Sequence, residues 1–233
     1  MLYQLILMQI SAHLMADYIY QPQEWCNKKN QITFSGYHFL HAFIVFITAY
    51  LFSLDFNFWF GALIIGFSHL LVDLIKSYMI RNSNKNYYFM DQAIHLGIIV
   101  IISYLYSRLS EINFLLNIDF KTTAIIASYI FCAKPANILI KNIFNSFSLS
   151  YTPDNSTVNN DKDLPNAGQL IGIMERFLTL SLILAGQYEA VGLIIAAKSI
   201  LRFNDTQKNE YVLVGTLLSF GIAVIVAILI NQL

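Results

Sequence analysis

The sequence predicts an all-α fold, a polytopic membrane helical bundle of about eight transmembrane helices. Of its 233 residues, 57% are hydrophobic and 12% are charged, whereas a soluble domain is roughly 45–50% apolar and about 25% charged. Apolar runs of about 20 residues, the length that an α-helix needs to cross the hydrocarbon core, recur along the whole chain. The runs are continuous and do not alternate with a period of two, which disfavours a membrane barrel.

The crossings are predicted in chain order at 1–20, 36–54, 57–80, 90–109, 121–146, 168–186, 188–202 and 210–231. Pro135 is expected to kink the fifth of these helices. The segment 188–202 is short, because at about 1.5 Å per residue it reaches only ~22 Å of a core that is ~30 Å thick. As an alternative, it pairs with 168–186 as a re-entrant hairpin, which leaves six full crossings.

The crossings group into four predicted parts. Residues 1–110 form a four-helix membrane bundle, 111–146 contain a fifth helix, 147–167 form a flexible cytoplasmic loop, and 168–233 form a three-helix membrane part. The run His13-Leu-Met-Ala-Asp17 is echoed by His69-Leu-Leu-Val-Asp73 two crossings later. This echo suggests that the helix pairs 1–2 and 3–4 are a parallel repeat about an axis along the membrane normal.

The distribution of basic residues predicts the orientation in the membrane. Eleven of the fourteen lysines and arginines fall on the side of the 21–35 connection, while Arg108 and Lys121 fall on the other side and Lys134 lies inside a segment. By the positive-inside rule the first side is cytoplasmic and the N-terminus is outside. Because the chain is predicted to span the membrane, the lipid bilayer is its expected partner. The balance of 14 basic and 14 acidic residues excludes a nucleic-acid binder.

Ionisable residues in the first four segments occur in four pairs, each one helical turn apart. The pairs are His13 with Asp17, His38 with His41, His69 with Asp73, and Asp91 with His95. Such spacing places both members on one helix face. With alternating helix directions, all four pairs lie at the same, cytoplasmic end of the bundle. Polar residues here could serve only to join neighbouring helices, but four pairs at one level favour a functional site.

The pairs predict a divalent metal site, because imidazole and carboxylate together bind zinc or manganese and carboxylates alone suit magnesium. The expected ligands are His13, His41, His69, Asp73, Asp91 and His95. Asp17 and His38 are expected to act as further ligands, as partners of ligands or as general base. Lys76 could hold an anionic group, and Gln21 and Gln92 are candidate hydrogen-bond donors to ligands or substrate.

The last three segments carry a second set of charges at their cytoplasmic ends. The set comprises Glu175, Arg176, Lys198, Arg202 and Glu210. One hypothesis is that Lys198 and Arg202 clamp a phosphate or an anionic lipid head group. The alternative is that these residues only snorkel to the interface and form salt bridges.

These motifs resemble a bacterial membrane-protein family known as domain of unknown function 3307. The resemblance rests on His13-Leu-Met-Ala-Asp17, Gln21, Trp25, Lys28-Lys29, the His38 and His41 helix, Ser68-His69-Leu-Leu-Val-Asp73-Leu-Ile-Lys76 and Asp91-Gln92-Ala-Ile-His95. The runs around Glu175-Arg176, Lys198 to Arg202 and Glu210-Tyr211 are similar to longer members. The resemblance implies a multi-pass protein of the bacterial inner membrane, but the family lends no established activity. The His-x-x-x-Asp helix ends also resemble inner-membrane metal-dependent hydrolases.

Three functions are compatible with the pattern. The first is a metal-dependent hydrolase acting on a phosphoester or lipid-linked substrate at the cytoplasmic face. The second is a transporter or channel in which the same groups carry protons or metal ions, although the outer halves of the first four segments read as nearly all apolar. The third is a non-catalytic membrane scaffold that binds an anionic lipid or a phosphorylated small molecule through the C-terminal cations.

Overall fold

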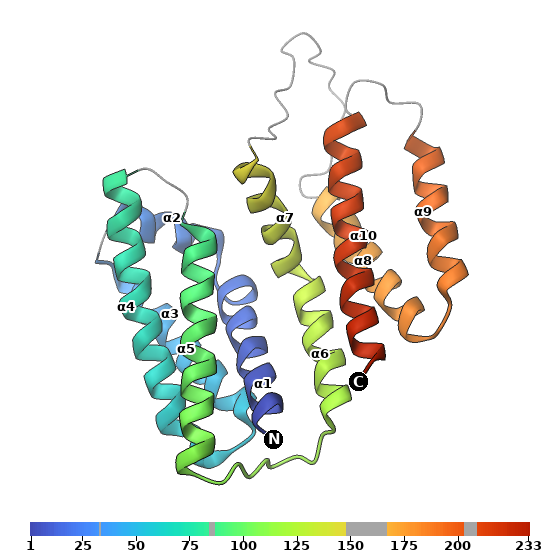
Figure 1. The fold of residues 1–233 in the computed structure, drawn as a ribbon. Coiled ribbons are helices and arrows are strands. Elements are labelled where there is room, and N and C mark those ends of the chain that lie inside the picture. Colours follow the sequence, from blue (N-terminus) through green and yellow to red (C-terminus); the bar gives the residue numbers. More distant parts are fainter. Residues whose placement is uncertain (33, 84–86, 148–166, 203–208) are drawn as a thin grey trace. The chain divides into compact units, whose positions relative to one another are not determined.

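The structure, a computed structural model, describes residues 1–32, 34–83, 87–147, 167–202 and 209–233, without the side chains of 30, 167, 201, 202 and 209–212. The described residues form helices and no strand (Figure 1). The elements are α1 (Leu2–Leu14), η1 (Met15–Ile19), α2 (Gln23–Gln31), α3 (Gly36–Ser53), η2 (Phe56–Phe58), α4 (Trp59–Ser83), α5 (Tyr88–Leu109), α6 (Phe120–Cys132), α7 (Lys134–Ser146), α8 (Ala167–Leu184), α9 (Tyr188–Arg202) and α10 (Asn209–Asn231). The all-α prediction is confirmed, and helices occupy each of the predicted segments.

Two predicted segments are interrupted. The first continues from α1 into η1, a single π-helical turn in which the Tyr20 amide donates to the Met15 carbonyl at 2.9 Å. The fifth breaks at Ala133 into α6 and α7, which are bent by 51°. Pro135 lies in the first turn of α7, where its missing amide hydrogen is tolerated. The kink expected at this proline is therefore present as a break in the helix.

Helix α2 lies in the connection 21–35 and was not predicted. It begins after Pro22, with Glu24 in its first turn and Lys28 and Lys29 in its last. Both placements suit the helix dipole. Its residues are too polar to read as a crossing, so the apolar pattern gives no signal for it. The helix matters because it brings Lys29 into the interior, where only 6% of the residue is exposed.

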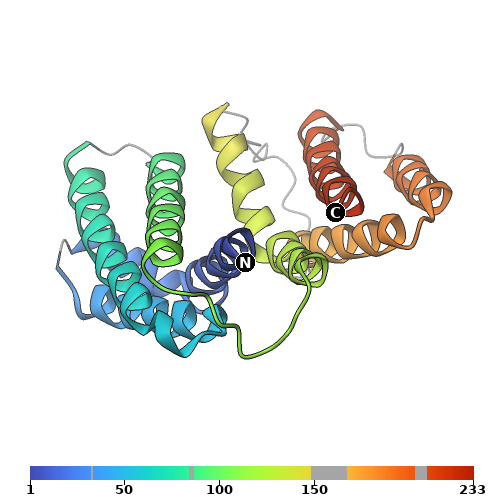
Figure 2. The same ribbon diagram turned by 60° about the horizontal axis from the view of Figure 1, so that its bottom comes forward.

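The chain divides into two compact units, Met1–Ala127 and Ser128–Leu233, and the division falls within α6. In the first unit, α3 contacts α4, α4 contacts α5, and α1 contacts both α3 and α5, so the four helices close a bundle (Figures 1 and 2). In the second unit, α10 packs on α8 and α7, and α9 packs on α8. The predicted loop 147–167 lies almost entirely outside the described residues.

Polarity in the first unit is inverted relative to a soluble bundle. Large apolar side chains such as Phe43, Phe67 and Ile101 are exposed, at 59% each. Apolar side chains, including Leu5, Phe58 and Ile99, fill only part of the interior. Histidine and aspartate side chains are buried beside them. Such inversion is typical of helices that face lipid and enclose a functional polar group.

By length and composition, four helices within the described residues are able to cross a membrane. They are α3, the joined segment Phe56–Ser83, α5, and Leu213–Asn231 of α10, with α6 and α7 together as a fifth if the bent pair is one span. The chain thus contains several helices long and apolar enough for a membrane. The count of eight crossings remains a prediction.

Candidate metal centre

The predicted histidine and carboxylate pairs lie at one level of the bundle in the first unit, near the end of α1 and the starts of α3 and α5. The pair on α4 lies in the middle of that helix and not at its end, because α4 continues to Ser83. The structure brings together seven of their eight members, which are His13, Asp17, His41, His69, Asp73, Asp91 and His95. They come from four helical segments, namely α1 together with its continuation η1, and the helices α3, α4 and α5. The histidines of this cluster and the two aspartates on α4 and α5 are buried, with at most 5% of each residue exposed. The one-turn spacing and the common end therefore predicted this convergence.

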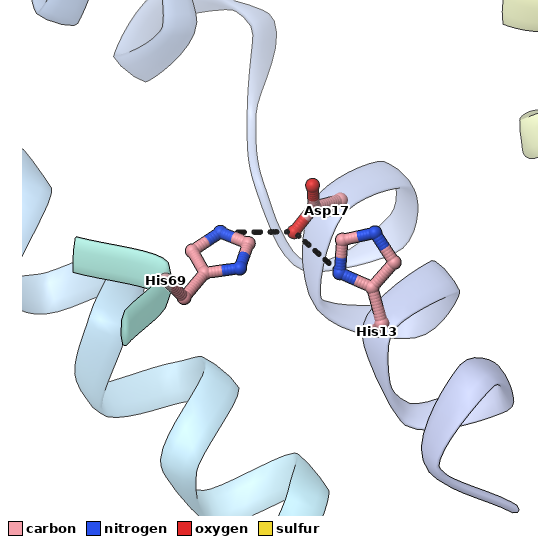
Figure 3. Close-up of side chains that lie close together, drawn as sticks. All are labelled: His13, Asp17 and His69. Carbon is pink, nitrogen blue, oxygen red and sulfur yellow. Dashed lines mark ion pairs between the residues drawn. The ribbon is translucent and has the colours of Figure 1, made fainter. Parts of the chain in front are cut away.

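Asp17 lies between imidazoles from three helices. Its Oδ1 is 3.2 Å from Nε2 of His41. The same oxygen is 3.4 Å from Nε2 of His69 and 3.6 Å from Nδ1 of His13 (Figure 3). The residue lies within η1, and π-helical turns are often found at functional sites because they re-aim side chains. No pattern in the sequence signals this turn.

His41 and His69 face each other across α3 and α4. Their Nε2 atoms are 3.0 Å apart. The two helices approach closely at Gly66, where an added Cβ would lie 3.0 Å from Cβ of Phe46 and 3.1 Å from the carbonyl of Ala42. The absence of a side chain at Gly66, one turn before His69, is what lets the two imidazoles meet.

A second group of ligand atoms lies on α4 and α5. One atom each from Asp73, Asp91 and His95 lies within 4.8 Å of the other two, and Nε2 of His95 is 3.4 Å from Oδ1 of Asp91. Two ammonium groups neutralise these carboxylates. Lys29 donates to Oδ2 of Asp73, and Lys76 donates to Oδ2 of Asp91 at 2.6 Å. In Asp91 the second oxygen is thereby left facing His95.

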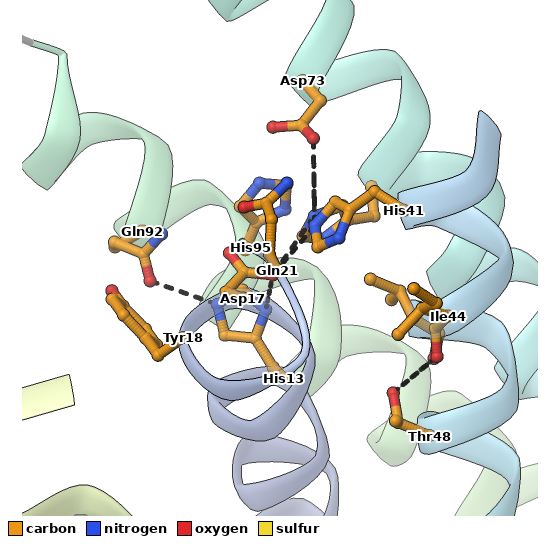
Figure 4. A network of polar contacts seen from close by, with 12 residues as sticks. His13, Asp17, Tyr18, Gln21, His41, Ile44, Thr48, Asp73, Gln92 and His95 are labelled. Carbon is orange, nitrogen blue, oxygen red and sulfur yellow. Dashed lines mark hydrogen bonds and ion pairs between the residues drawn. The ribbon is translucent and has the colours of Figure 1, made fainter. Parts of the chain in front are cut away.

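Gln92 determines which nitrogen of His13 carries the proton. A carboxylate only accepts hydrogen bonds, so Nε2 of Gln92 is the atom that donates to Oδ2 of Asp91, at 3.2 Å. Its Oε1 then accepts from Nε2 of His13, also at 3.2 Å (Figure 4). In the neutral imidazole, Nδ1 of His13 therefore presents a lone pair to Oδ1 of Asp17, which is also an acceptor.

Several buried polar atoms of the cluster have no hydrogen-bond partner within the described residues. These atoms are Nδ1 of His13, Oδ1 of Asp17, Nε2 of Gln21, Nδ1 of His41, Oδ1 of Asp91 and Nε2 of His95. Leaving such a group unpaired costs about 1–3 kcal/mol. Native proteins contain few of them, and each calls for a reason such as a catalytic role or a bound water or ion.

Gln21 follows η1 in the chain, and its side chain is seen in front of the cluster in Figure 4. Its Oε1 accepts a hydrogen bond from the Cys26 thiol at 3.3 Å, so its Nε2 is the free end of the amide. Burial raises the pKa of the Cys26 thiol, which keeps the thiol protonated and able to donate. The amide is therefore held with its donor available.

His38 is buried like the other histidines but does not join the cluster. Its Nδ1 contacts Ser35 in a capping box at the start of α3, and its Nε2 contacts the Ser77 hydroxyl at 3.0 Å. Both ring nitrogens are thus used by neighbouring serines. A spacing of three residues puts His38 and His41 on one face, but only His41 lies at the depth of Asp17.

In the second unit, the predicted anion clamp has an internal partner. Lys198 donates to Oε2 of Glu175, and its ammonium lies 5.4 Å from the centroid of the Phe220 ring. Arg202 lies outside the residues whose side chains are described. The clamp therefore remains a prediction.

Arg176 makes a set of contacts that its sequence position did not indicate. Only 1% of it is exposed. Its guanidinium donates to the carbonyls of Cys132 at 2.7 Å and Ala133 at 3.2 Å, to Oδ1 of Asn137 at 2.6 Å and to Oγ of Ser219 at 2.9 Å. In a continuous helix, backbone amides would donate to these carbonyls. At the break between α6 and α7, the guanidinium of Arg176 donates to them instead.

Lys29 is the residue of the cluster that the sequence reasoning missed. It was named only among the basic residues that set the orientation and in the Lys28-Lys29 run of the family resemblance, not as a site residue. Its partner Asp73 is far away in the chain and lies on α4. A buried lysine from a short polar helix leaves no periodic signal, so only the fold could place it.

Comparison with known proteins identifies a family for the first unit. Neither the curated proteins nor the solved structures compared with the chain match it significantly. A family model described as "Protein of unknown function (DUF3307)" matches residues 5–125, slightly more than half of the chain. The match contains every residue of the cluster, whereas the similarity noted for the C-terminal motifs lies outside it. The chain therefore belongs to the DUF3307 family.

Proposed function

We propose that the first unit binds a divalent transition-metal ion between Asp17, His41 and His69. One observation carries this proposal. The three facing atoms, Oδ1 of Asp17 and the two Nε2 atoms, form a triangle with sides of 3.0, 3.2 and 3.4 Å. A tetrahedral ion with bonds of about 2.0–2.1 Å separates its ligand atoms by about 3.3–3.4 Å. The triangle therefore has the dimensions of one face of such a coordination shell.

The chemistry of the donor atoms supports the same ion. Mixed imidazole and carboxylate ligands favour zinc or manganese over magnesium, which prefers oxygen and retains water. Nδ1 of His13, at 3.6 Å from Oδ1 of Asp17, and Oδ2 of Asp73, at 3.8 Å from Nε2 of His69, are the candidates for a fourth ligand. Gln92 orients His13 by a hydrogen bond to its other nitrogen, as partners of metal-bound histidines commonly do.

The activity that this centre supports best is hydrolysis of a phosphoester. A bound ion of this kind polarises a phosphoryl oxygen and supplies activated water near neutral pH. Lys76, with 29% of its side chain exposed, is placed to attract the anionic substrate. Nε2 of Gln21 is placed to donate to a substrate oxygen. Asp17 serves as a ligand in this proposal, and His38 serves the packing of α3 and α4.

The proposed setting is the bacterial inner membrane, with the N-terminus outside and the cluster at the cytoplasmic face. The excess of basic residues on one side supports this orientation. It places the cluster where a lipid-linked phosphoester or a phosphorylated small molecule could reach it. Eight crossings, with helix pairs 1–2 and 3–4 as a repeat, complete the proposal. The matched His13–Asp17 and His69–Asp73 pairs, which both face the cluster, support the repeat.

A panel of phosphoesters tests the activity. The purified chain in detergent is expected to hydrolyse at least one of them, to lose the activity after chelation, and to regain it with zinc or manganese. Asp17→Asn should lower the rate at least about 100-fold, because an amide is a poor ligand in place of a carboxylate. Glu24→Gln on the exposed face of α2 is the matched control. Hydrolysis that survives both chelation and Asp17→Asn would contradict the proposal.

Gln21→Ala tests the donor role of the amide. The substitution is expected to lower kcat on the order of 100-fold, the usual effect of removing one donor that stabilises charge in the transition state. The metal content should stay unchanged, because Gln21 is not a proposed ligand. Gln23→Ala, which alters an exposed glutamine of α2, serves as the control. A wild-type kcat in Gln21→Ala would show that the amide has no part in the reaction.

A second candidate function is ion transport, and one observation favours it. Oε1 of Gln9 and Oγ of Ser103 are buried without a hydrogen-bond partner within the described residues. They lie in α1 and α5 on the far side of the cluster from α2, where the sequence reads as nearly apolar. Proteoliposomes would decide between the functions. A proton or metal flux that follows its gradient and is lost in His95→Ala would favour transport over hydrolysis.

A further inference from the structure

Asp73 is shared by two groups of ligand atoms. It groups with His41 and His69 on one side and with Asp91 and His95 on the other, and in each group the atoms lie within 4.8 Å of one another. A carboxylate has two oxygens and can bind one ion with each. The position of Asp73 is therefore that of a bridge between two neighbouring coordination sites.

The atoms of the second group are arranged for a cation. Oδ1 of Asp91 and Nε2 of His95 face each other at 3.4 Å, and each is buried without a hydrogen-bond partner among the described residues. Oδ2 of Asp91 already accepts from Lys76 and Gln92. Protein donors thus hold one oxygen of the carboxylate and leave the other free. This pattern is typical of a metal-binding carboxylate whose orientation is set by its neighbours.

The two groups lie side by side. The rings of His69 and His95 are stacked, with centroids 3.9 Å apart and planes inclined by 17°. One of these histidines belongs to each group. The two groups are therefore adjacent, as the two ions of a two-metal site require.

The charges of the cluster determine when a second ion would bind. Asp17, Asp73 and Asp91 carry three negative charges, and Lys29 and Lys76 carry two positive charges. With neutral imidazoles, one divalent ion leaves an excess of one positive charge and a second raises that excess to three. The second ion should therefore bind more weakly than the first, and an anion such as phosphate should strengthen its binding.

From these contacts we infer that Asp73, Asp91 and His95 bind a second divalent transition-metal ion, with the Asp73 carboxylate shared between the two ions. The inference rests on the proposed function, because it requires the first ion at Asp17, His41 and His69. It gives that function a more specific form. Two adjacent ions suit a phosphoester, since together they stabilise both the attacking and the leaving oxygen.

Titration with manganese, followed by electron paramagnetic resonance, tests the inference on the full chain in detergent. The chain is first stripped with a chelator and then titrated with and without inorganic phosphate. The wild type should bind two equivalents, and the bound ions should show the exchange coupling that a shared carboxylate produces. Phosphate should tighten the second equivalent at least tenfold. His95→Gln and Asp91→Asn should each retain only the first equivalent, while the buried control His38→Gln retains both.

The outcomes separate this inference from the proposed function. A wild type that binds one equivalent would overturn the second site and leave the first intact. A wild type that binds none would overturn both. Two equivalents without exchange coupling would place the second ion away from Asp73. Two equivalents that persist in both His95→Gln and Asp91→Asn would place it outside the second group.

Discussion

Replacing His69 by alanine is expected to lower the affinity of the chain for zinc more than about 100-fold. His69 lies at the centre of the cluster, with its Nε2 3.0 Å from Nε2 of His41 and 3.4 Å from Oδ1 of Asp17. Loss of a group that merely orients a ligand already weakens metal binding about 10–100-fold. Loss of the ligand itself should weaken it more. Competition with a chromogenic chelator measures the affinity directly.

His38→Ala is the matched control for this prediction. Both histidines are buried, at 3% for His69 and 1% for His38, so both substitutions leave a cavity of similar size. Only His69 offers a nitrogen to the cluster. His69→Gln, which fills most of the volume, separates the loss of a ligand from the loss of packing. Equal zinc affinities for His69→Gln, His38→Ala and the wild type would contradict the assignment of His69 as a ligand.

Arg176→Leu is expected to lower the free energy of unfolding of the chain by about 3 kcal/mol or more. The guanidinium donates four hydrogen bonds, two of them buried and two half-buried, and hydrogen bonds to charged groups contribute about 1.5–3 kcal/mol each. Leucine fills part of the volume but satisfies none of the acceptors. The carbonyls of Cys132 and Ala133 would then lose this donor beside the break in the helix.

Titration with sodium dodecyl sulfate, followed by circular dichroism, measures this loss in detergent. Lys141→Leu is the control, because Lys141 is an exposed cation on α7 of the same unit. It should change the unfolding free energy by no more than about 0.5 kcal/mol. A similar small change in Arg176→Leu would show that the guanidinium does not stabilise the break. Metal affinity should be unchanged in Arg176→Leu, since the cluster lies in the first unit.

The helices could be predicted because their cause lies in the sequence. Long apolar runs specified α3, α4, α5 and α10, and Pro135 specified where the fifth segment breaks. Helix α2 has no apolar run, and its burial of Lys29 depends on where α4 places Asp73. The π-helical turn at Asp17 depends on tertiary packing, because nothing in its sequence distinguishes it from an ordinary α-helix.

Most members of the cluster were predictable, but its geometry was not. One-turn spacing and the common end of the bundle predicted that the pairs converge. They did not predict that His41 meets His69, because that contact depends on the close approach of α3 and α4 at Gly66. Nor did they separate His38 from His41. The two share a helix face, and the difference in depth along α3 decides which one reaches Asp17.

The metal content of the purified wild-type chain tests the central claim most directly. The chain would be purified without chelator from cells grown with zinc and manganese, and element-resolved mass spectrometry would count the ions per chain. We predict at least one zinc or manganese ion per chain, falling below about 0.1 in the double variant His41→Ala, His69→Ala. A wild type with no more bound metal than this variant, both as purified and after incubation with either ion, would contradict the claim.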